Sequence, residues 1–239
     1  MTELESATDL ELIPVIPFSY FILLIAGVAI GTSAAVLLLP SILPGLHSSI
    51  NSEHPKAFWY LSRSSAMVAF ILLWLSMALG LMITNKLARI WPGGPIAYDV
   101  HQFSSIVGLA FAIFHALILL GDAYISFDFL SVIVPFVSHS YRPFWVGIGQ
   151  VSLYLMAIVI LSFYLRKQIT RKGWRLLHFT SYLVFLLALI HGVASGSDTQ
   201  NLWVRSLYWL LLGSILFLTV YRVLTRIFRP AMKKSIANP

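Results

Sequence analysis

Long apolar runs separated by short polar connections dominate this chain. A helix that crosses a bilayer needs about 20 apolar residues, and six of the runs are that long. Proline, glycine and charged residues gather between the runs, as at 92–95 and 195–198, where they favour turns over helix. The pattern predicts spans at about 17–40, 58–84, 100–120, 144–165, 177–194 and 202–227.

These runs predict an all-α, polytopic membrane protein. We expect residues 1–239 to form one domain, a six-helix transmembrane bundle with its core at about 58–222. A polar N-terminal tail is expected at 1–16 and a basic C-terminal tail at 228–239. Composition agrees, because 59% of the residues are hydrophobic and only 10% are charged, against about 25% charged in soluble domains. Lipid must therefore cover most of the surface.

Basic residues flank the apolar runs, so the net charge of +7 indicates a membrane surface rather than nucleic acid. Six spans place both chain ends on one side. If that side is the cytoplasm, 12 Lys and Arg residues lie inside and 4 outside, as the positive-inside rule requires. We expect an integral protein of a prokaryotic plasma membrane with both termini in the cytoplasm. Cysteine is absent, which excludes disulfides, iron–sulfur clusters and covalent c-type haem.

Four of the seven histidines fall within predicted spans: His101 and His115 in the third, His178 and His191 in the fifth. An ionisable side chain at membrane depth is costly and usually faces the bundle interior for a functional reason. Spans three and five run in the same direction, and each separates its histidines by about 20 Å. We therefore expect His101 level with His178 near the cytoplasmic face, and His115 level with His191 nearer the outer face.

Two stacked bis-imidazole sites suit haem, because haem iron accepts an axial imidazole from each side. Zinc is less suitable, since the sequence places no carboxylates at these depths. The remaining alternative is four unrelated structural histidines. One geometric difficulty concerns the fifth span, whose histidines are 13 residues apart and so lie about 140° apart around an ideal helix. Either this helix is distorted, or its two histidines approach their sites from different directions.

These histidines and their neighbours resemble a known family. The stretches 99–101, 174–182 and 191–192, together with His115, are similar to the ferric reductase-like transmembrane domain. That family includes NADPH oxidases, ferric-chelate reductases and bacterial six-helix haem proteins, and the resemblance covers about 58–222. It implies electron flow from the cytoplasm to the outer face. It also implies two haem b groups, with iron bound by His101, His115, His178 and His191.

Three further residues are candidates for haem contacts. Arg63, near the outer end of the second span, matches the family's Arg-small-small pattern and suits a haem propionate; otherwise it is an arginine snorkelling to the interface. Trp174 and Tyr182 lie four residues either side of His178 and so share its helix face. They would pack on the inner haem or relay electrons to it, although an interfacial aromatic belt also accounts for Trp174. Asp198 resembles the family's outer Gly-x-Asp turn.

The expected function is that of a cytochrome b: an oxidoreductase component for transmembrane electron transport, with no catalytic residue assigned. The alternatives are a terminal reductase of oxygen, ferric iron or quinone, and a non-redox transporter or assembly factor. Oxidases and reductases of the family carry a flavin and nicotinamide domain after the sixth helix, where about a dozen residues stand here. No flavin motif is present, so we expect a separate cytoplasmic flavoprotein, or a quinol, as electron donor. A basic loop suits either partner docking or anionic lipid: Arg166, Lys167, Arg171, Lys172 and Arg175.

Overall fold

The computed structural model describes residues 14–51 and 56–237, and all regular structure within them is helical. Six stretches are long and apolar enough to cross a membrane, as the hydrophobic pattern predicts. The long helices are α2 (Phe18–Ile42), α4 (Ala57–Thr84), α5 (Gly94–Ile118), α7 (Pro143–Tyr164), α9 (Ser181–Ser195) and α10 (Leu202–Ala237). The short ones are α3 (Pro44–Asn51), η1 (Leu87–Arg89), η2 (Leu119–Gly121), α6 (Phe129–Ile133), α8 (Arg171–Phe179) and η3 (Ser197–Gln200).

Two boundaries differ from those expected. The third span begins at Gly94 rather than near residue 100, because Gly93 adopts φ 108 and Pro95 fits the first turn of the helix. The sixth helix does not stop near residue 227 but continues to 237, through most of the stretch expected to be a basic tail. The expected polar tail at 1–16 lies mostly outside the described residues.

The fifth span is broken into α8 and α9 at Thr180. The backbone N–H of Thr180 donates to the carbonyl of Leu177, three residues back, at 3.1 Å, and its hydroxyl donates to the same carbonyl at 2.6 Å. A bond to the third residue back tightens the turn and changes the rotation of everything that follows. The first of the two alternatives for this span, a distorted helix, is therefore the one that the chain adopts.

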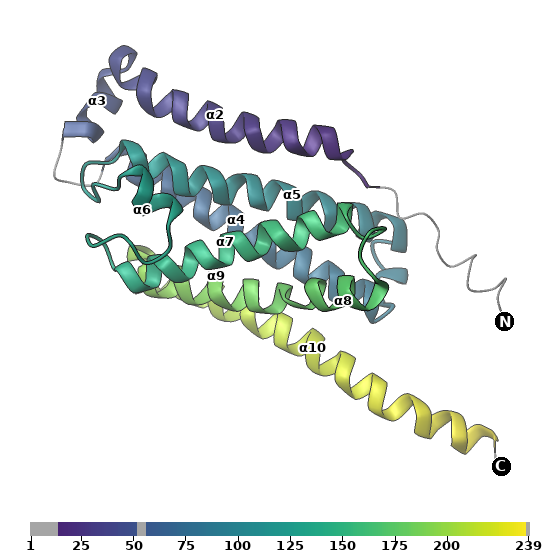
Figure 1. Ribbon diagram of the computed structural model, residues 1–239. Helices are drawn as coiled ribbons and strands as arrows, with labels where there is room; N and C mark the ends of the chain where they lie inside the picture. Colours follow the sequence, from purple (N-terminus) through teal and green to yellow (C-terminus); the bar gives the residue numbers. More distant parts are fainter. Residues whose placement is uncertain (1–13, 52–55, 238–239) are drawn as a thin grey trace.

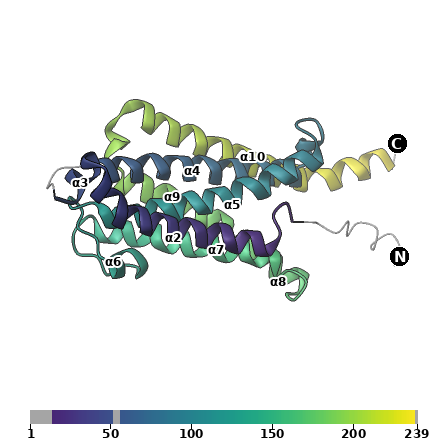
Figure 2. The ribbon, with the colours of Figure 1, turned by 90° about the horizontal axis from the view of Figure 1, so that it is seen from above.

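Helices α4, α5, α7 and α9 form the centre of the bundle, with α4 packed along α5 and α7 along α9. One hydrophobic cluster joins these four helices, through residues such as Phe70, Leu109, Met156 and Val184. Helix α2 lies on the outside against α5, while α10 crosses α4 and projects beyond the bundle (Figures 1 and 2). The first span begins and the last ends at the same end of the molecule, as six crossings require (Figure 1).

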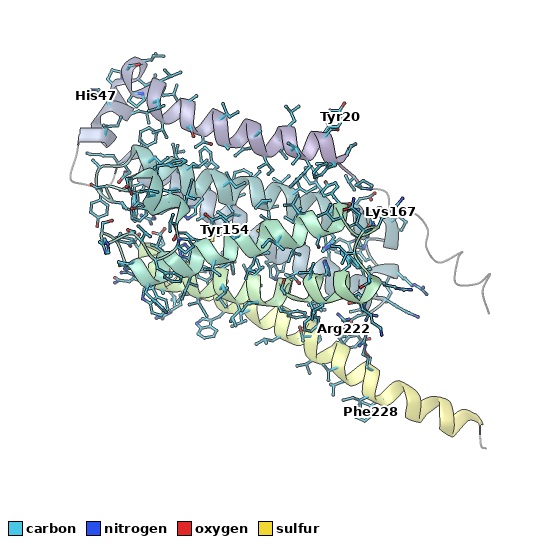
Figure 3. The ribbon with its side chains drawn as sticks, viewed as in Figure 1. Tyr20, His47, Tyr154, Lys167, Arg222 and Phe228 are labelled. Carbon is cyan, nitrogen blue, oxygen red and sulfur yellow. The ribbon has the colours of Figure 1, made fainter. Side chains whose placement is uncertain are left out.

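The two ends of the bundle differ in charge. Lys167 and Arg222 lie toward one end and His47 lies at the other (Figure 3). We call the first the basic end, because α8 with its three cations also lies there (Figure 1). The second, which carries His47 and the start of α4, is called the opposite end. Large apolar side chains remain exposed along all six long helices, as expected of surfaces that face lipid.

Candidate functional site

The four membrane histidines meet as two pairs. The rings of His101 and His178 have their centres 6.1 Å apart at the basic end, and those of His115 and His191 are also 6.1 Å apart. Helix α5 carries one member of each pair and is continuous between them, so the pairs are separated by about 21 Å along its axis. This is the pairing that the helix spacing predicts. We call them the basic-end pair and the opposite-end pair.

The spacing within each pair suits one metal atom between two imidazoles. The centre of an imidazole ring lies about 1.1 Å behind its nitrogen, and a metal–nitrogen bond is about 2.0 Å long, so two imidazoles on opposite sides of one metal have ring centres about 6.2 Å apart. A direct hydrogen bond between the two rings would bring the centres to about 5 Å. The observed 6.1 Å agrees with the first arrangement in both pairs.

Helix α4 anchors the two histidines of α5. The Nδ1 atom of His115 lies 2.8 Å from the carbonyl oxygen of Ser62, and that of His101 lies 2.8 Å from the carbonyl oxygen of Ser76. A carbonyl only accepts, so each Nδ1 donates its proton and each Nε2 keeps a free lone pair for a metal. Sequence reasoning missed these serines. The two serines are 14 residues apart, as are the two histidines. Because α4 and α5 are antiparallel neighbours, this equal spacing could have indicated that each serine lies beside a histidine.

Helix α7 anchors His191 in the same manner. Its Nδ1 donates to the carbonyl oxygen of Trp145 at 2.9 Å. One turn further along α7, the backbone of Gly149 runs so close to the imidazole that a Cβ there would lie 2.5 Å from Nδ1. Only glycine leaves room for the ring at this point. Neither Trp145 nor Gly149 stands out in the sequence, because the helix rotation that brings them to His191 is not encoded locally.

The fourth histidine is held differently. Among the described residues His178 makes no hydrogen bond through its ring, and instead Trp174 stacks on it at 5.2 Å with an angle of 24° between the planes. Trp174 therefore lies beside His178, as its position four residues earlier predicts. Tyr182 does not repeat this contact. It lies beyond the break at Thr180 and packs against the ring of Phe179 at 5.0 Å, because the break rotates it relative to α8.

Arg63 and Asp198 form an ion pair at the opposite end. The Nε atom of Arg63 donates to Asp198 at 2.8 Å, and a second guanidinium nitrogen contacts the other carboxylate oxygen. The pair joins the start of α4 to η3, and the guanidinium also lies over the rings of Trp59 and Tyr60. A guanidinium has five N–H donors, so this contact leaves some for another anion. The contact of Arg63 with a haem propionate stays a prediction.

Asp122 fixes the end of α4 from which Ser62 and Arg63 project. It is 3% exposed and accepts hydrogen bonds from the backbone N–H groups of Trp59 at 3.1 Å, of Tyr124 at 3.1 Å and of Ile125 at 3.3 Å. The first bond satisfies one of the unpaired donors at the start of α4. Burial raises the pKa of Asp122 above its usual value, although the three hydrogen bonds oppose that shift.

A cavity surrounds the opposite-end pair. The space within it, counted together with its open mouth, is about 1430 Å³. Apolar side chains make up most of the wall. The polar groups in it include both histidines, the Arg63–Asp198 pair and Ser195, whose buried hydroxyl has no hydrogen-bond partner in the part of the chain that the structure describes.

The two pairs fit haem better than a bare metal ion. No group of three His, Cys, Asp or Glu side chains comes together in the described part of the chain, so each pair offers a metal only two ligands. Zinc in a protein usually has three or four protein ligands, whereas a porphyrin supplies its own four nitrogens and needs only the axial two. Beside each pair lies a buried donor that has no hydrogen-bond partner among residues 14–51 and 56–237: Trp174 Nε1 at the basic end and Ser195 Oγ at the opposite end. A bound group with a polar edge could accept these hydrogen bonds.

The chain belongs to the family described as a domain of unknown function (DUF8596), whose model matches residues 57–198. The matched segment extends from the start of α4 to η3. It contains all four membrane histidines, both anchoring serines and the two partners of the Arg63–Asp198 ion pair. No curated protein and no solved structure shows significant similarity to the chain.

Proposed function

We propose that this chain is a membrane cytochrome b that carries electrons between two haems, one held by each histidine pair. The observation that supports it most directly is the repeated 6.1 Å spacing between facing imidazoles, at two depths of one bundle. Haem supplies one-electron chemistry when bound, because its iron changes between the ferric and ferrous states. The resemblance to the ferric reductase-like transmembrane domain supports the same proposal.

The residues around the pairs would place and tune the cofactor. The carbonyls of Ser62, Ser76 and Trp145 fix the tautomer and orientation of three imidazoles, which also raises the basicity of each ligand. Two histidines on each haem iron would leave no position for a substrate there. The chain is therefore suited to outer-sphere electron transfer, and the apolar bundle between the pairs excludes water from the path.

Haem content and ligand variants test this proposal. Protein purified after expression with ample haem should contain two haems per chain and show a reducible low-spin spectrum. His101→Ala should lose one haem, and His139→Ala, a change at an exposed histidine outside the spans, should lose none. A parent protein with one haem or none would overturn the two-haem proposal. A colourless protein would favour a transporter or assembly factor instead.

The cavity at the opposite end supports a second candidate, a terminal reductase. Its volume and its Arg63–Asp198 pair provide space and charge for oxygen, a ferric chelate or a quinone beside the opposite-end pair. The reduced chain would then be reoxidised by one of these acceptors in the absence of any other protein. Reoxidation at the rate of free haem would contradict this candidate and leave electron transfer to a partner.

We expect the electron donor to be a separate flavoprotein or a membrane quinol. Nicotinamide cofactors deliver hydride, and a flavin is needed to divide it into single electrons for haem. NADH or NADPH alone should therefore leave the purified, flavin-free chain oxidised, whereas a quinol or an added flavoprotein should reduce it. Rapid reduction by NADPH in the absence of flavin would contradict this expectation.

A further inference from the structure

The short helix α8 has two chemically different faces. One face, which includes Trp174 and His178, is half-buried against the bundle. The other is exposed and carries both cations and large apolar side chains: Arg171, Lys172, Arg175, Leu176 and Phe179. Leu176 is 71% exposed and Phe179 is 62% exposed, so the cations and the apolar groups share one surface. We call this surface the exposed face of α8.

The exposed face lies where the fifth span meets the membrane surface. Phe179 is exposed at the end of α8, and exposed apolar side chains follow on α9 at Leu183 and Leu186, so lipid tails cover this part of the fifth span. Arg175 lies one turn before Phe179, about 6 Å further from the membrane centre, and Arg171 lies about 6 Å beyond that. If Phe179 lies at the edge of the lipid tails, Arg175 and Arg171 lie at the level of the phospholipid headgroups, which long basic side chains reach by snorkelling.

The charge on this face is unbalanced within the described residues. Arg171, Lys172 and Arg175 form no ion pair with a described carboxylate, and α8 itself contains no Asp or Glu. A short helix that combines basic residues with exposed Leu and Phe at a bilayer surface is typical of binding to anionic lipid. A face that docks a soluble protein would not need exposed Leu176 and Phe179 immediately before the lipid-facing side chains of α9.

We propose that the exposed face of α8 binds the headgroup of an anionic phospholipid, with Arg171, Lys172 and Arg175 on the phosphate and Phe179 among the acyl chains. The bound lipid also holds His178 in place. His178 lies on the other face of the same two turns and has no ring hydrogen bond among the described residues. Helix α8 is joined to α9 by the turn at Thr180 and by the ring contact of Phe179 with Tyr182. This consequence for His178, unlike the lipid binding, rests on the proposed function.

Native mass spectrometry of the detergent-purified chain tests the lipid site without any haem. Phosphatidylglycerol adducts should form at lower lipid concentrations than phosphatidylcholine adducts. Their affinity should fall about five-fold for each cation replaced by Gln, since a basic residue at an anionic surface contributes about 1 kcal/mol. A control variant removes three cations from the same end of the bundle and should keep the affinity: Lys86→Gln, Arg89→Gln and Arg222→Gln together.

Equal affinities for the two lipids, or equal losses in the α8 variant and the control, would overturn the site and leave the cations to a protein partner. Displacement of the lipid by inorganic phosphate alone would likewise overturn it, since the acyl contacts would then contribute nothing.

The effect on His178 is tested in nanodiscs by the electron paramagnetic resonance signal of the basic-end haem. Removing phosphatidylglycerol, or replacing the three cations of α8, should broaden that signal and leave the opposite-end haem unchanged. An unchanged signal, with lipid adducts still lost, would refute the coupling to His178. A parent protein without haem would refute the proposed function, while the adduct measurement would still decide the lipid site.

Discussion

Gly149 offers a sharp test of the opposite-end pair, because it is the point of closest approach between backbone and imidazole. A Cβ at this position would lie 2.5 Å from His191 Nδ1 and 2.7 Å from Cε1, well inside van der Waals contact. The atoms in the way belong to a ring whose other side faces His115 at 6.1 Å between centres. In Gly149→Ala the imidazole must therefore move away from Trp145 and out of its place in the pair.

The free energies in Gly149→Ala oppose each other. Overpacking a well-packed interior costs about 1–3 kcal/mol, and the lost hydrogen bond to Trp145 costs about 1 kcal/mol. Replacing a helical glycine by alanine returns up to about 1 kcal/mol. The net loss in the free energy of unfolding is therefore about 2 kcal/mol, which is small enough for the protein to fold. The displaced ligand should then appear in cofactor binding more clearly than in stability.

The assay is haem per chain with the absorption spectrum of the reduced protein, alongside thermal unfolding in detergent. Gly149→Ala should keep one haem, at the basic end. Gly80→Ala is the matched comparison, because its Cβ would lie 3.3 Å from His101 Cε1, and a shift of a few tenths of an ångström should preserve both haems. Gly213→Ala, with nothing within 4 Å, is the neutral control. Two haems with an unchanged spectrum in Gly149→Ala would refute this account of how His191 is placed.

Three further predictions concern the other groups. His101→Ala and His178→Ala should each remove the same haem, and loss of different haems, seen by redox titration, would contradict the pairing. Arg63→Ala should lower the reduction potential of the opposite-end haem, because it removes a nearby cation. Asp198→Asn should raise that potential, because it removes an anion. Shifts of the same sign in both variants would refute the electrostatic account. Asp122→Ala should cost about 1–3 kcal/mol in thermal unfolding, because buried N–H groups lose their acceptor. Burial raises the pKa of Asp122, so the stability of the parent relative to Asp122→Asn should be greatest at low pH. This advantage should be lost as the pH rises through the raised pKa of Asp122.

The sequence alone determined the six spans and the depth of the candidate site. The length of each apolar run predicts whether that run crosses the membrane, whatever its neighbours are. This is because each spanning helix must satisfy its backbone hydrogen bonds internally. The order of the spans then placed His101 level with His178 and His115 level with His191, which is how the rings lie. The haem itself and the direction of electron flow stay predictions.

Tertiary structure decided what holds each ring. The carbonyls of Ser62 and Trp145, the room beside Gly149 and the partner of Arg63 all depend on how the helices rotate about their axes and cross one another. The break at Thr180 was also decided by tertiary structure. The sequence required either a distorted fifth span or two histidines that approach their sites from different directions, and it did not distinguish between these alternatives. Helix rotation in a membrane is set by close packing between spans far apart in the chain, and no single span encodes it.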